Sequence, residues 1–327
     1  MRPDLGVGNP PPTEIGRRHS IRLKTSDGAR DLLGTLTAPT EITKKDGSVH
    51  SFDPTQILAW RVIEELTRQA GQGAPASLRI AELEALSTTT WPASEIVARG
   101  GWLYRTSDGY NFRSNSVLIT GDPEFADPVL PLDEELDFLI AYFGTRKLTP
   151  TIALTLPRFE TLDQILEAKG WQIAIDAQMM VADKSAISLG HFPSGSPGSQ
   201  APYSVKHFDH PAPLFQEIRE NSKALEVMSS YPASYICLVD HDGVGFAAGR
   251  IATLDDWAIV TAIFIKPTHR GKNWSRVLMK EVLDRTAANK IALQVDSSNH
   301  VALHLYTSLG FRKHHDYRFR TWGQRNS

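Results

Sequence analysis

The sequence predicts an α+β protein in which a small N-terminal β-barrel precedes two larger mixed α/β units of one design. Short alternating strands broken by turn signals fill residues 17–65. Strand and helix patterns then alternate over residues 77–184, the earlier run, and again over residues 202–327, the later run. Segments of the later run match segments of the earlier run at an almost constant spacing, which indicates duplicated domains.

The first 65 residues divide into a tail and a barrel. Residues 1–16 combine many prolines and glycines with few apolar side chains, so we expect a disordered tail. "HSIRLK" alternates, a Ser-Asp-Gly turn and "LLGTLT" follow, and "EITKKDGSVHSF" is a hairpin folded at Asp46-Gly47. "TQILAWRVIEEL" closes the barrel or runs on into a helix. Strands this short and this close together predict a barrel of the SH3-like kind, and "RQAGQGAPAS" is a linker by composition.

The earlier run mixes helical and strand periods. "LRIAELEAL" is helical, and "GGWLYRTSDGYNFRSNSVLIT" predicts two strands around a Ser-Asp-Gly turn. "LDEELDFLIAYFGTRK" is an amphipathic helix whose acidic first turn suits the positive end of the helix dipole. "TIALTL" is a strand, "LDQILEAKGW" a helix ended by Gly170, and "QIAIDAQMMVA" a strand.

The later run follows a linker at residues 185–201 that is rich in Gly, Ser and Pro. Its predicted order is a strand, a helix around "PLFQEIRENSKALEVM", strands, a turn, a helix, a strand, a helix and a strand. "TIALTL" ends 139 positions before "KIALQV", and "LEAKGW" matches "YTSLGF" at a spacing of 140. Two α/β units of one design follow from this repetition.

The two runs differ where chemistry is expected. In the later run the strand "AIVTAIFIKP" is followed by "THRGKNWS" and a helix. The earlier run has "NSVLITGDPEFADPVLPLDEEL" at that place, where a phosphate would meet Asp122, Glu124 and Asp127 instead of donors. Leu166 stands where the later run has Tyr306. We therefore expect the later run to be functional and the earlier run to be structural.

Composition narrows the class of protein. The apolar content of 41% and charged content of 22% are typical of a soluble globular protein, and the net charge of -2 does not favour nucleic acid as the main partner. Cys237 is the only cysteine, which excludes an internal disulfide and, within a predicted strand, suggests a buried thiol. No stretch approaches the ~20 apolar residues of a membrane helix, and the start has no apolar signal core. We expect a cytoplasmic protein without a membrane partner.

The Arg-Gly turn in "HRGKNWSRVLMKEVL" leads directly into an amphipathic helix. A helix N-terminus offers unpaired N–H groups and the positive end of the dipole to a pyrophosphate, and Arg270 and Lys272 add positive charge. The stretch resembles the central motif of the Gcn5-related N-acetyltransferase (GNAT) family, Arg/Gln-x-x-Gly-x-Gly/Ala, at Arg270, Asn273 and Ser275. "NHVALHLYTSLGF" is similar to the family's second motif, and the matching positions are Asn299, Ala302, Tyr306, Gly310 and Phe311.

The resemblance extends beyond these motifs. "GGWLYRTSDGYNFRSNSV" and "LPLDEEL" look like the non-catalytic half found in an actinobacterial GNAT subgroup. That subgroup carries an SH3-like barrel in front and often ends in His-His-x-Tyr-x-x-Arg, which "HHDYRFR" matches.

The resemblance implies acetyl-CoA as co-substrate and a role for each matching residue. The strand residues Ile263, Phe264 and Ile265 would bond pantetheine through their main chain. Asn299 would fix the loop near pantetheine, and Tyr306 would protonate the departing thiolate; the alternative for Tyr306 is a tyrosine that only packs in its helix. The pyrophosphate would be held by the backbone N–H groups of Arg270, Gly271, Lys272, Asn273, Trp274 and Ser275.

Two departures from the family pattern matter. Asn273 replaces the central glycine, but Asn tolerates the left-handed backbone region, so the turn is still allowed; the adjacent Trp274 stands where the family has an apolar residue facing the core. An amine must lose a proton before it attacks a thioester, and the position of the Glu base in relatives that acetylate protein N-termini is Gln294 here. Asp296 shares its strand face and is the candidate base. A water chain to Glu220 or to a histidine is the alternative.

Other groups give weaker indications. His300, His304, His314 and His315 crowd the end of the chain, but neighbouring strand residues point opposite ways, so no metal is expected. The leading hypothesis is an acetyl-CoA-dependent N-acetyltransferase acting by direct attack of a primary amine of a small molecule or protein. A non-catalytic CoA-binding sensor or scaffold is the alternative. A third hypothesis, a nucleic-acid-associated protein led by the basic residues of the barrel, is less favoured.

Overall fold

The computed structural model describes residues 14–26, 28–44, 47–62, 76–121, 126–190, 203–220 and 225–323. The chain divides into two compact units, Met1–Arg68 and Gln69–Ser327. Several predictions lie outside the described residues: most of the tail, Asp46 in the hairpin, the two linkers from residue 68 and from residue 191, and the acidic residues Asp122 and Glu124. No helix in the described ranges is both long enough and apolar enough to span a membrane.

The first compact unit is an antiparallel sheet over a small apolar core. The described strands lie in the order β4-β3-β2-β1-β5. Ile21, Leu36 and Ile42 have no exposed surface, so the alternation in the sequence marks the buried face. No pairing joins β4 to β5 within the described residues, so barrel closure of the SH3-like kind stays a prediction. The elements are β1 (Arg18–Thr25), β2 (Gly28–Ala38), β3 (Glu41–Thr43), β4 (Val49–Ser51), η1 (Pro54–Gln56) and β5 (Ile57–Val62).

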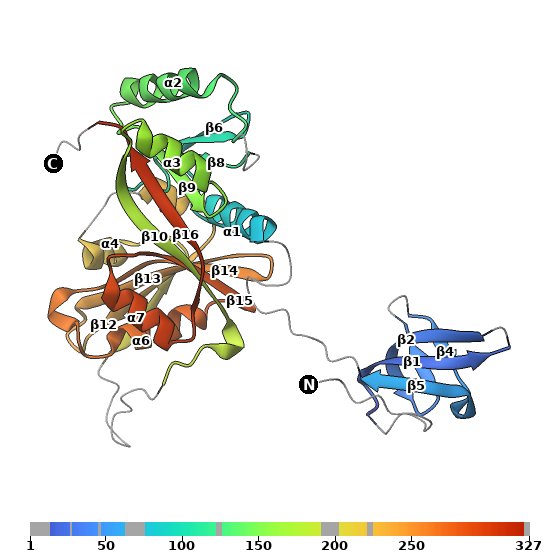
Figure 1. Cartoon of the computed structure of the whole chain (residues 1–327). Helices are drawn as coiled ribbons and strands as arrows, with labels where there is room; N and C mark the ends of the chain where they lie inside the picture. Colours follow the sequence, from blue (N-terminus) through green and yellow to red (C-terminus); the bar gives the residue numbers. More distant parts are fainter. Residues whose placement is uncertain are drawn as a thin grey trace. The chain divides into compact units, whose positions relative to one another are not determined.

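The second compact unit is built on one large mixed sheet (Figure 1). Among the described strands its order is β11-β12-β13-β14-β15-β10-β16-β9-β8-β7-β6. The elements of the earlier run are α1 (Ala76–Thr90), β6 (Glu95–Arg99), β7 (Trp102–Thr106), β8 (Ser116–Ile119), α2 (Leu132–Thr145), β9 (Thr151–Leu156), α3 (Glu160–Ala168), β10 (Gln172–Asp183) and η2 (Lys184–Ala186). Those of the later run are β11 (Ser204–Phe208), α4 (Pro213–Arg219), α5 (Leu225–Ser229), β12 (Ser234–Val239), β13 (Gly245–Leu254), β14 (Trp257–Ile265), η3 (Pro267–His269), α6 (Trp274–Leu283), β15 (Lys290–Asp296), α7 (His300–Ser308) and β16 (Arg312–Thr321).

The two runs repeat the same order of elements. In each, three antiparallel strands are followed by a helix and by a strand parallel to the third: β8 with β9, and β14 with β15. A second helix then ends at a glycine with positive φ, Gly170 at 91° and Gly310 at 100°, before a last strand. The aromatic residue after each glycine, Trp171 or Phe311, is buried, so the sequence match at a spacing of 140 corresponds to one local structure.

Two predictions need correction. The single helix expected around "PLFQEIRENSKALEVM" is interrupted, because α4 ends at Glu220, whose φ of 53° is left-handed and breaks the helical path. The strand β6 was not predicted, since "EIVAR" gives only a short alternation beside a Gly-Gly turn.

The last strands of the two runs are exchanged. β10, which ends the earlier run, pairs with β15 of the later run, and β16, which ends the later run, pairs with β9 of the earlier run. β10 and β16 also pair with each other, and Figure 1 shows them running side by side through the middle of the sheet. The exchange joins both runs into one sheet.

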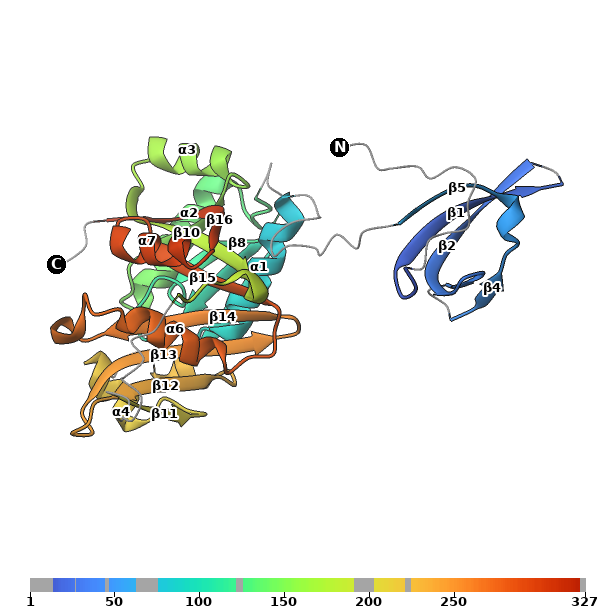
Figure 2. The same cartoon turned by 90° about the horizontal axis from the view of Figure 1, so that it is seen from below.

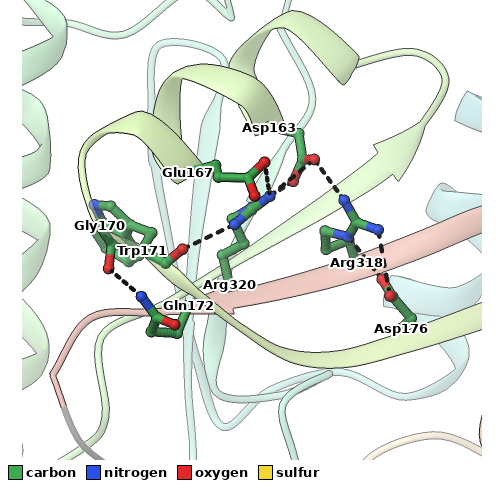
Figure 3. A network of polar contacts seen from close by, with 8 residues as sticks. All are labelled: Asp163, Glu167, Gly170, Trp171, Gln172, Asp176, Arg318 and Arg320. Carbon is green, nitrogen blue, oxygen red and sulfur yellow. Dashed lines mark hydrogen bonds and ion pairs between the residues drawn. The ribbon is translucent and has the colours of Figure 1, made fainter.

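Buried ion pairs fix the exchanged strand β16 to the earlier run (Figure 3). Arg320 Nε donates to Asp163 Oδ1 at 2.6 Å, and Arg318 Nη1 donates to Asp163 Oδ2 at 2.7 Å. Arg318 also pairs with Asp176 on β10 at 2.7 Å. Although burial acts to raise it, the hydrogen bonds from Arg320 and Arg318 hold the pKa of Asp163 below its ordinary value. The final arginine of the His-His-x-Tyr-x-x-Arg pattern is therefore a structural residue.

Opposite faces of the later run's sheet are covered by different helices. Tyr235 and Cys237 of β12 pack with α4, whereas Ile236 and Leu238 pack with α6, as strand alternation requires. Figure 2 shows β11 to β14 side by side with α6. Burial raises the pKa of the Cys237 thiol to about 12, which fits an inert thiol in the core.

Candidate active site

The strands β14 and β15 separate in the middle of the sheet. They pair in parallel only from Trp257 opposite Lys290 to Val260 opposite Leu293. Both strands continue beyond that point, β14 to Ile265 and β15 to Asp296, without pairing to each other. The edge of β14 that includes Ile263, Phe264 and Ile265 therefore faces an open wedge, where its main chain can bond a ligand.

A β-bulge produces the separation. The register between β13 and β14 shifts between the pairs Ala248–Phe264 and Arg250–Thr261. Within the bulge Ala262 has a φ of 57°, a left-handed conformation that is unfavourable for a residue with a side chain. Gly249 lies opposite, and a Cβ there would meet Ile263 Cδ1 at 2.8 Å. A side chain at position 249 would therefore press on the side chains of Ile263, beside the bulge, and of Val282 on α6.

The turn between β14 and α6 presents unpaired backbone donors. None of the N–H groups from Gly271 to Ser275 donates to another described residue, and the first hydrogen bond of α6 runs from Arg276 N to Asn273 O at 3.0 Å. Gly271 and Asn273 are left-handed, with φ of 75° and 61°. Asn273 therefore adopts the conformation that its tolerance for this region predicts. Unpaired N–H groups at a helix start suit a pyrophosphate.

The side chains of this turn point to different surroundings. Trp274 packs edge-on against Phe246 with ring centroids 5.0 Å apart, so its indole faces the core as predicted. Arg270 bends back, and its Nε donates to Ile265 O at 3.1 Å, which ties the turn to the end of β14. Lys272 is exposed.

Tyr306 lies on the buried face of α7. It is 7% exposed, and its ring packs against Phe311 at a centroid distance of 5.9 Å. The hydroxyl has no hydrogen-bond partner among the described residues. Burial raises the pKa of Tyr306 to about 12, so the hydroxyl stays protonated and available as a donor near neutral pH.

The start of α7 is fixed by two polar side chains. Asn299 caps the helix by accepting from Ala302 N at 3.1 Å. Asp296 Oδ1 accepts from Ser298 N at 2.8 Å and Ser298 Oγ at 2.7 Å, so this carboxylate stabilises the turn. The side chain is exposed, and its other oxygen accepts no hydrogen bond from the described residues.

Gln294 has an unexpected partner from the earlier run. Its Oε1 accepts from Arg113 Nε at 3.0 Å and also from Arg113 Nη2. Arg113 follows β7, so its approach to β15 depends on the shared sheet and not on sequence proximity. Gln294, which stands where the family resemblance places a glutamate base, is therefore fixed by hydrogen bonds from Arg113.

One cleft of about 600 Å³ brings nearly all of the predicted residues together. Lys272 does not line it, and neither does Glu220, which is exposed at the end of α4. The predicted residues that line it are Ile263, Phe264, Ile265, Arg270, Gly271, Asn273, Trp274, Ser275, Asp296, Asn299 and Tyr306.

The corresponding turn of the earlier run is filled by the protein itself. Gly101 N donates to Asp127 O at 2.7 Å, and Trp102 Nε1 donates to Ala126 O at 2.8 Å. Glu135, in the first turn of α2, has no exposed surface; it accepts from Tyr104 OH at 2.6 Å and pairs with Arg99 at 3.2 Å. A carboxylate thus occupies the helix start, which disfavours a second anion there.

The four histidines lie on two elements, α7 and β16. His300 and His304 are exposed on α7, whereas His315 is buried and approaches Glu84 at 3.5 Å. His314 Nδ1 lies 2.8 Å from His315 Nδ1. Among the described residues no three His, Cys, Asp or Glu side chains gather as ligands for a metal ion.

Sequence analysis missed the residues beside Gln294. A second cavity of about 230 Å³ adjoins the wedge and is lined by Trp91, Tyr110, Asn111, Arg113 and Arg219. Three of these five lie in "GYNFRSN", which follows the Ser-Asp-Gly turn between two predicted strands and for which the sequence predicts no site residue. The sequence held no signal for the four residues of the earlier run, because they reach the site through the sheet that both runs share, whereas Arg219 lies on α4 of the later run.

This architecture is similar to that of known proteins. A family model described as "Probable histone acetyltransferase Rv0428c C-terminal" matches residues 77–320. A GCN5-related N-acetyltransferase from Kribbella flavida has a similar structure, with a TM-score of 0.57 and 14% identity over 77% of this chain and 97% of its own. A functionally unknown conserved protein from Staphylococcus epidermidis gives a TM-score of 0.51 and 10% identity over 71% of this chain and 94% of its own.

No curated protein matches the sequence. At these identities the structural likeness establishes the fold alone. The family model, in contrast, spans residues 77–320 of the 327. The larger compact unit therefore has the fold of a GCN5-related N-acetyltransferase, and the chain belongs to the family of the "Probable histone acetyltransferase Rv0428c C-terminal" region.

Proposed function

We propose that this protein transfers an acetyl group from acetyl-CoA to a primary amine of a small molecule or protein. One observation carries the proposal: the open wedge between β14 and β15, the unpaired N–H groups from Gly271 to Ser275 and the hydroxyl-bearing face of α7 line a single cleft. The name of the matching family, a probable histone acetyltransferase, supports acetyl transfer. The similar structure from Kribbella flavida carries the same activity in its description.

The residues present fit acetyl-CoA. The N–H groups at the start of α6 would hold the pyrophosphate, and the free edge of β14 from Ile263 to Ile265 would bond the pantetheine amides. Asn299 would keep the start of α7 in place beside it. Bound acetyl-CoA would supply the thioester whose carbonyl carbon is attacked.

The proposed transfer needs one acid and one base. The amine, after losing one proton to solvent, attacks the carbonyl carbon, and the bond between carbon and sulfur breaks. Tyr306 gives its hydroxyl proton to the departing sulfur, and the amide nitrogen loses its remaining extra proton to Asp296 or to a water beside it. Return of a proton from solvent to Tyr306 completes the cycle, so an ammonium and acetyl-CoA yield an amide, CoA and one proton.

We assign different roles to the parts of the chain. The earlier and later runs are proposed to be tandem GNAT-like units, and only the later one binds acetyl-CoA, since Glu135 fills the equivalent helix start in the earlier one. Residues 17–65 are proposed to form an SH3-like barrel with a structural or protein-docking role.

A second candidate is a CoA-binding sensor without transferase activity. It is favoured by Gln294, which cannot accept a proton and is held by Arg113. The two candidates differ in one assay: the whole chain is incubated with acetyl-CoA and a panel of amines, and both CoA release and acetylated amine are measured by mass spectrometry. Acetylated product that Tyr306→Phe reduces supports the transferase. Acetyl-CoA binding without transfer to any amine supports the sensor.

A further inference from the structure

The cavity beside Gln294 has a lining that is rich in hydrogen-bond donors. It shares Val260, Thr261, Ala262 and Gln294 with the acetyl-CoA cleft, so it adjoins the wedge from the side of α1 and α4. Its volume is about 230 Å³, which suits one end of a small molecule or of a chain terminus.

Two guanidinium groups line this cavity without a carboxylate partner. Arg113 donates only to Gln294, a neutral acceptor, and Arg219 donates to Tyr110 OH at 3.5 Å and Met228 Sδ at 3.3 Å. Neither arginine forms an ion pair with any carboxylate in the described part of the chain. Partly buried arginines in proteins are normally paired with an anion.

Two further residues of the cavity lining, Trp91 and Asn111, each carry a buried donor without a partner among the described residues. Trp91 is 8% exposed, and its Nε1–H makes no hydrogen bond. Asn111 accepts from Ser114 N at 2.9 Å through Oδ1, which fixes the amide and leaves Nδ2 buried without a partner. A buried donor without an acceptor is costly and rare, so these two groups indicate a ligand that brings acceptor oxygens.

The surrounding charges are mainly positive. Burial lowers the pKa of Arg113 to about 10, an effect that the charges of Tyr317 and Glu84 oppose and those of Arg105 and Arg250 reinforce. Glu84 is the one carboxylate among these neighbours, against the guanidinium groups of Arg113, Arg105 and Arg250, and it accepts a hydrogen bond from Tyr317. An incoming anion would therefore meet uncompensated positive charge.

We propose that the acceptor is an amine that also carries an oxyanion, a carboxylate or a phosphate, which Arg113 and Arg219 hold while the amine points into the wedge. The inference rests on the proposed acetyl transfer and specifies its substrate class. Arginine binds both oxyanions through parallel N–H donors, and Trp91 and Asn111 supply the remaining bonds. In this arrangement the acceptor is recognised by both runs: Trp91, Asn111 and Arg113 come from the earlier run, and Arg219 comes from α4 of the later run.

The first test measures binding at Trp91 directly. A proton–nitrogen correlation spectrum of the isotope-labelled whole chain resolves the indole N–H signals, and Trp91→Phe assigns the one that belongs to Trp91. We titrate γ-aminobutyrate against its carboxamide, which keeps the ammonium group but lacks the oxyanion, and phosphoethanolamine against ethanolamine. The Trp91 signal should move downfield with an oxyanion only, and the stronger of the two anionic ligands identifies carboxylate or phosphate.

The second test changes the arginines. Arg113→Met and Arg219→Met should each weaken binding of the anionic amine roughly 10- to 100-fold, Arg113→Lys should lose less, and acetyl-CoA affinity should not change. Arg61→Met, an exposed arginine of the first compact unit, is the matched control. Retained acetyl-CoA binding shows that each variant is folded.

The possible outcomes distinguish failure of the oxyanion site from failure of the proposed acetyl transfer. Equal response of Trp91 to amines with and without an oxyanion, or equal kcat/KM for both, overturns the inference and leaves acetyl transfer intact. Acetyl-CoA binding with an oxyanion response but without transfer to any amine overturns the acetyltransferase, and with it the acceptor role of the site.

Discussion

A single added methyl group at Gly249 should disturb the wedge that the proposed activity requires. Gly249 lies on β13 opposite the bulge of β14, where Ile263 and the α6 residue Val282 close over it. In Gly249→Ala the new Cβ would lie 2.8 Å from both Ile263 Cδ1 and Val282 Cγ2. Ordinary carbon contacts need about 3.5–4.0 Å, so each neighbour must move by roughly 1 Å.

The expected cost follows from that displacement. Overpacking of this size destabilises a core by about 1–3 kcal/mol. If the altered bulge raises the free energy of the acetyl-CoA complex by about 1.4 kcal/mol relative to the free protein, acetyl-CoA affinity falls roughly tenfold. Urea unfolding of the whole chain and calorimetric titration of acetyl-CoA measure the two effects.

Gly144→Ala is the matched control. Gly144 lies in α2, a Cβ there would meet nothing within 4 Å, and its φ is not positive. Alanine is a better helix former than glycine by about 0.5–1 kcal/mol, so this variant should gain stability and bind acetyl-CoA as before. Wild-type stability and affinity in Gly249→Ala would refute the argument that a side chain at position 249 disturbs the wedge.

Three further predictions concern the acid, the pyrophosphate turn and the exchanged strand. Tyr306→Phe should lower kcat roughly 10²- to 10⁴-fold without changing acetyl-CoA affinity; because the pKa of Tyr306 is raised to about 12, the pH–rate profile should show no loss of the acid near pH ~10, and unchanged turnover would exclude this residue as the acid. Asn273→Gly should retain or raise acetyl-CoA affinity, since glycine adopts the left-handed φ without strain; weaker binding would show that the asparagine side chain itself contacts the ligand. The pKa of Asp163 is lowered in the folded state, so its stabilising effect is present above its ordinary value of about 3.9 and is lost as the pH falls through the lower folded value. Asp163→Asn should cost about 3 kcal/mol at neutral pH, because the buried Arg320 then keeps only one ion pair, with the exposed Glu167 at 3.3 Å; an unchanged urea midpoint would contradict this.

Local patterns predicted much of the later run. The strand "AIVTAIFIKP" and the helix after the Arg-Gly turn lie as expected, because apolar periodicity and a helix-start turn are encoded within a few residues. Trp274 faces the core and Asn273 is left-handed for the same local reason. The cleft then follows from the order of these elements.

Long-range features could not be predicted in this way. The exchange of β10 and β16 depends on pairing between residues far apart in sequence, and nothing in "QIAIDAQMMVA" or "HHDYRFR" specifies a partner strand. The bond from Arg113 to Gln294 depends on that exchange. The left-handed Ala262 was also unexpected, because alanine does not favour this conformation and the bulge that contains it arises from pairing with β13.

The most direct test of the account is calorimetric titration of acetyl-CoA into the wild-type chain and into Ser275→Glu. A glutamate at this position would bring a negative charge to the start of α6, where the pyrophosphate is proposed to bind, as Glu135 does in the first turn of α2. The helix itself should not be destabilised, because acidic residues in a first turn favour a helix. The account predicts micromolar binding by the wild type and a loss of at least about tenfold in the variant, which should remain folded. No binding by the wild type, or equal binding by both, would contradict the assignment of this turn as the pyrophosphate site.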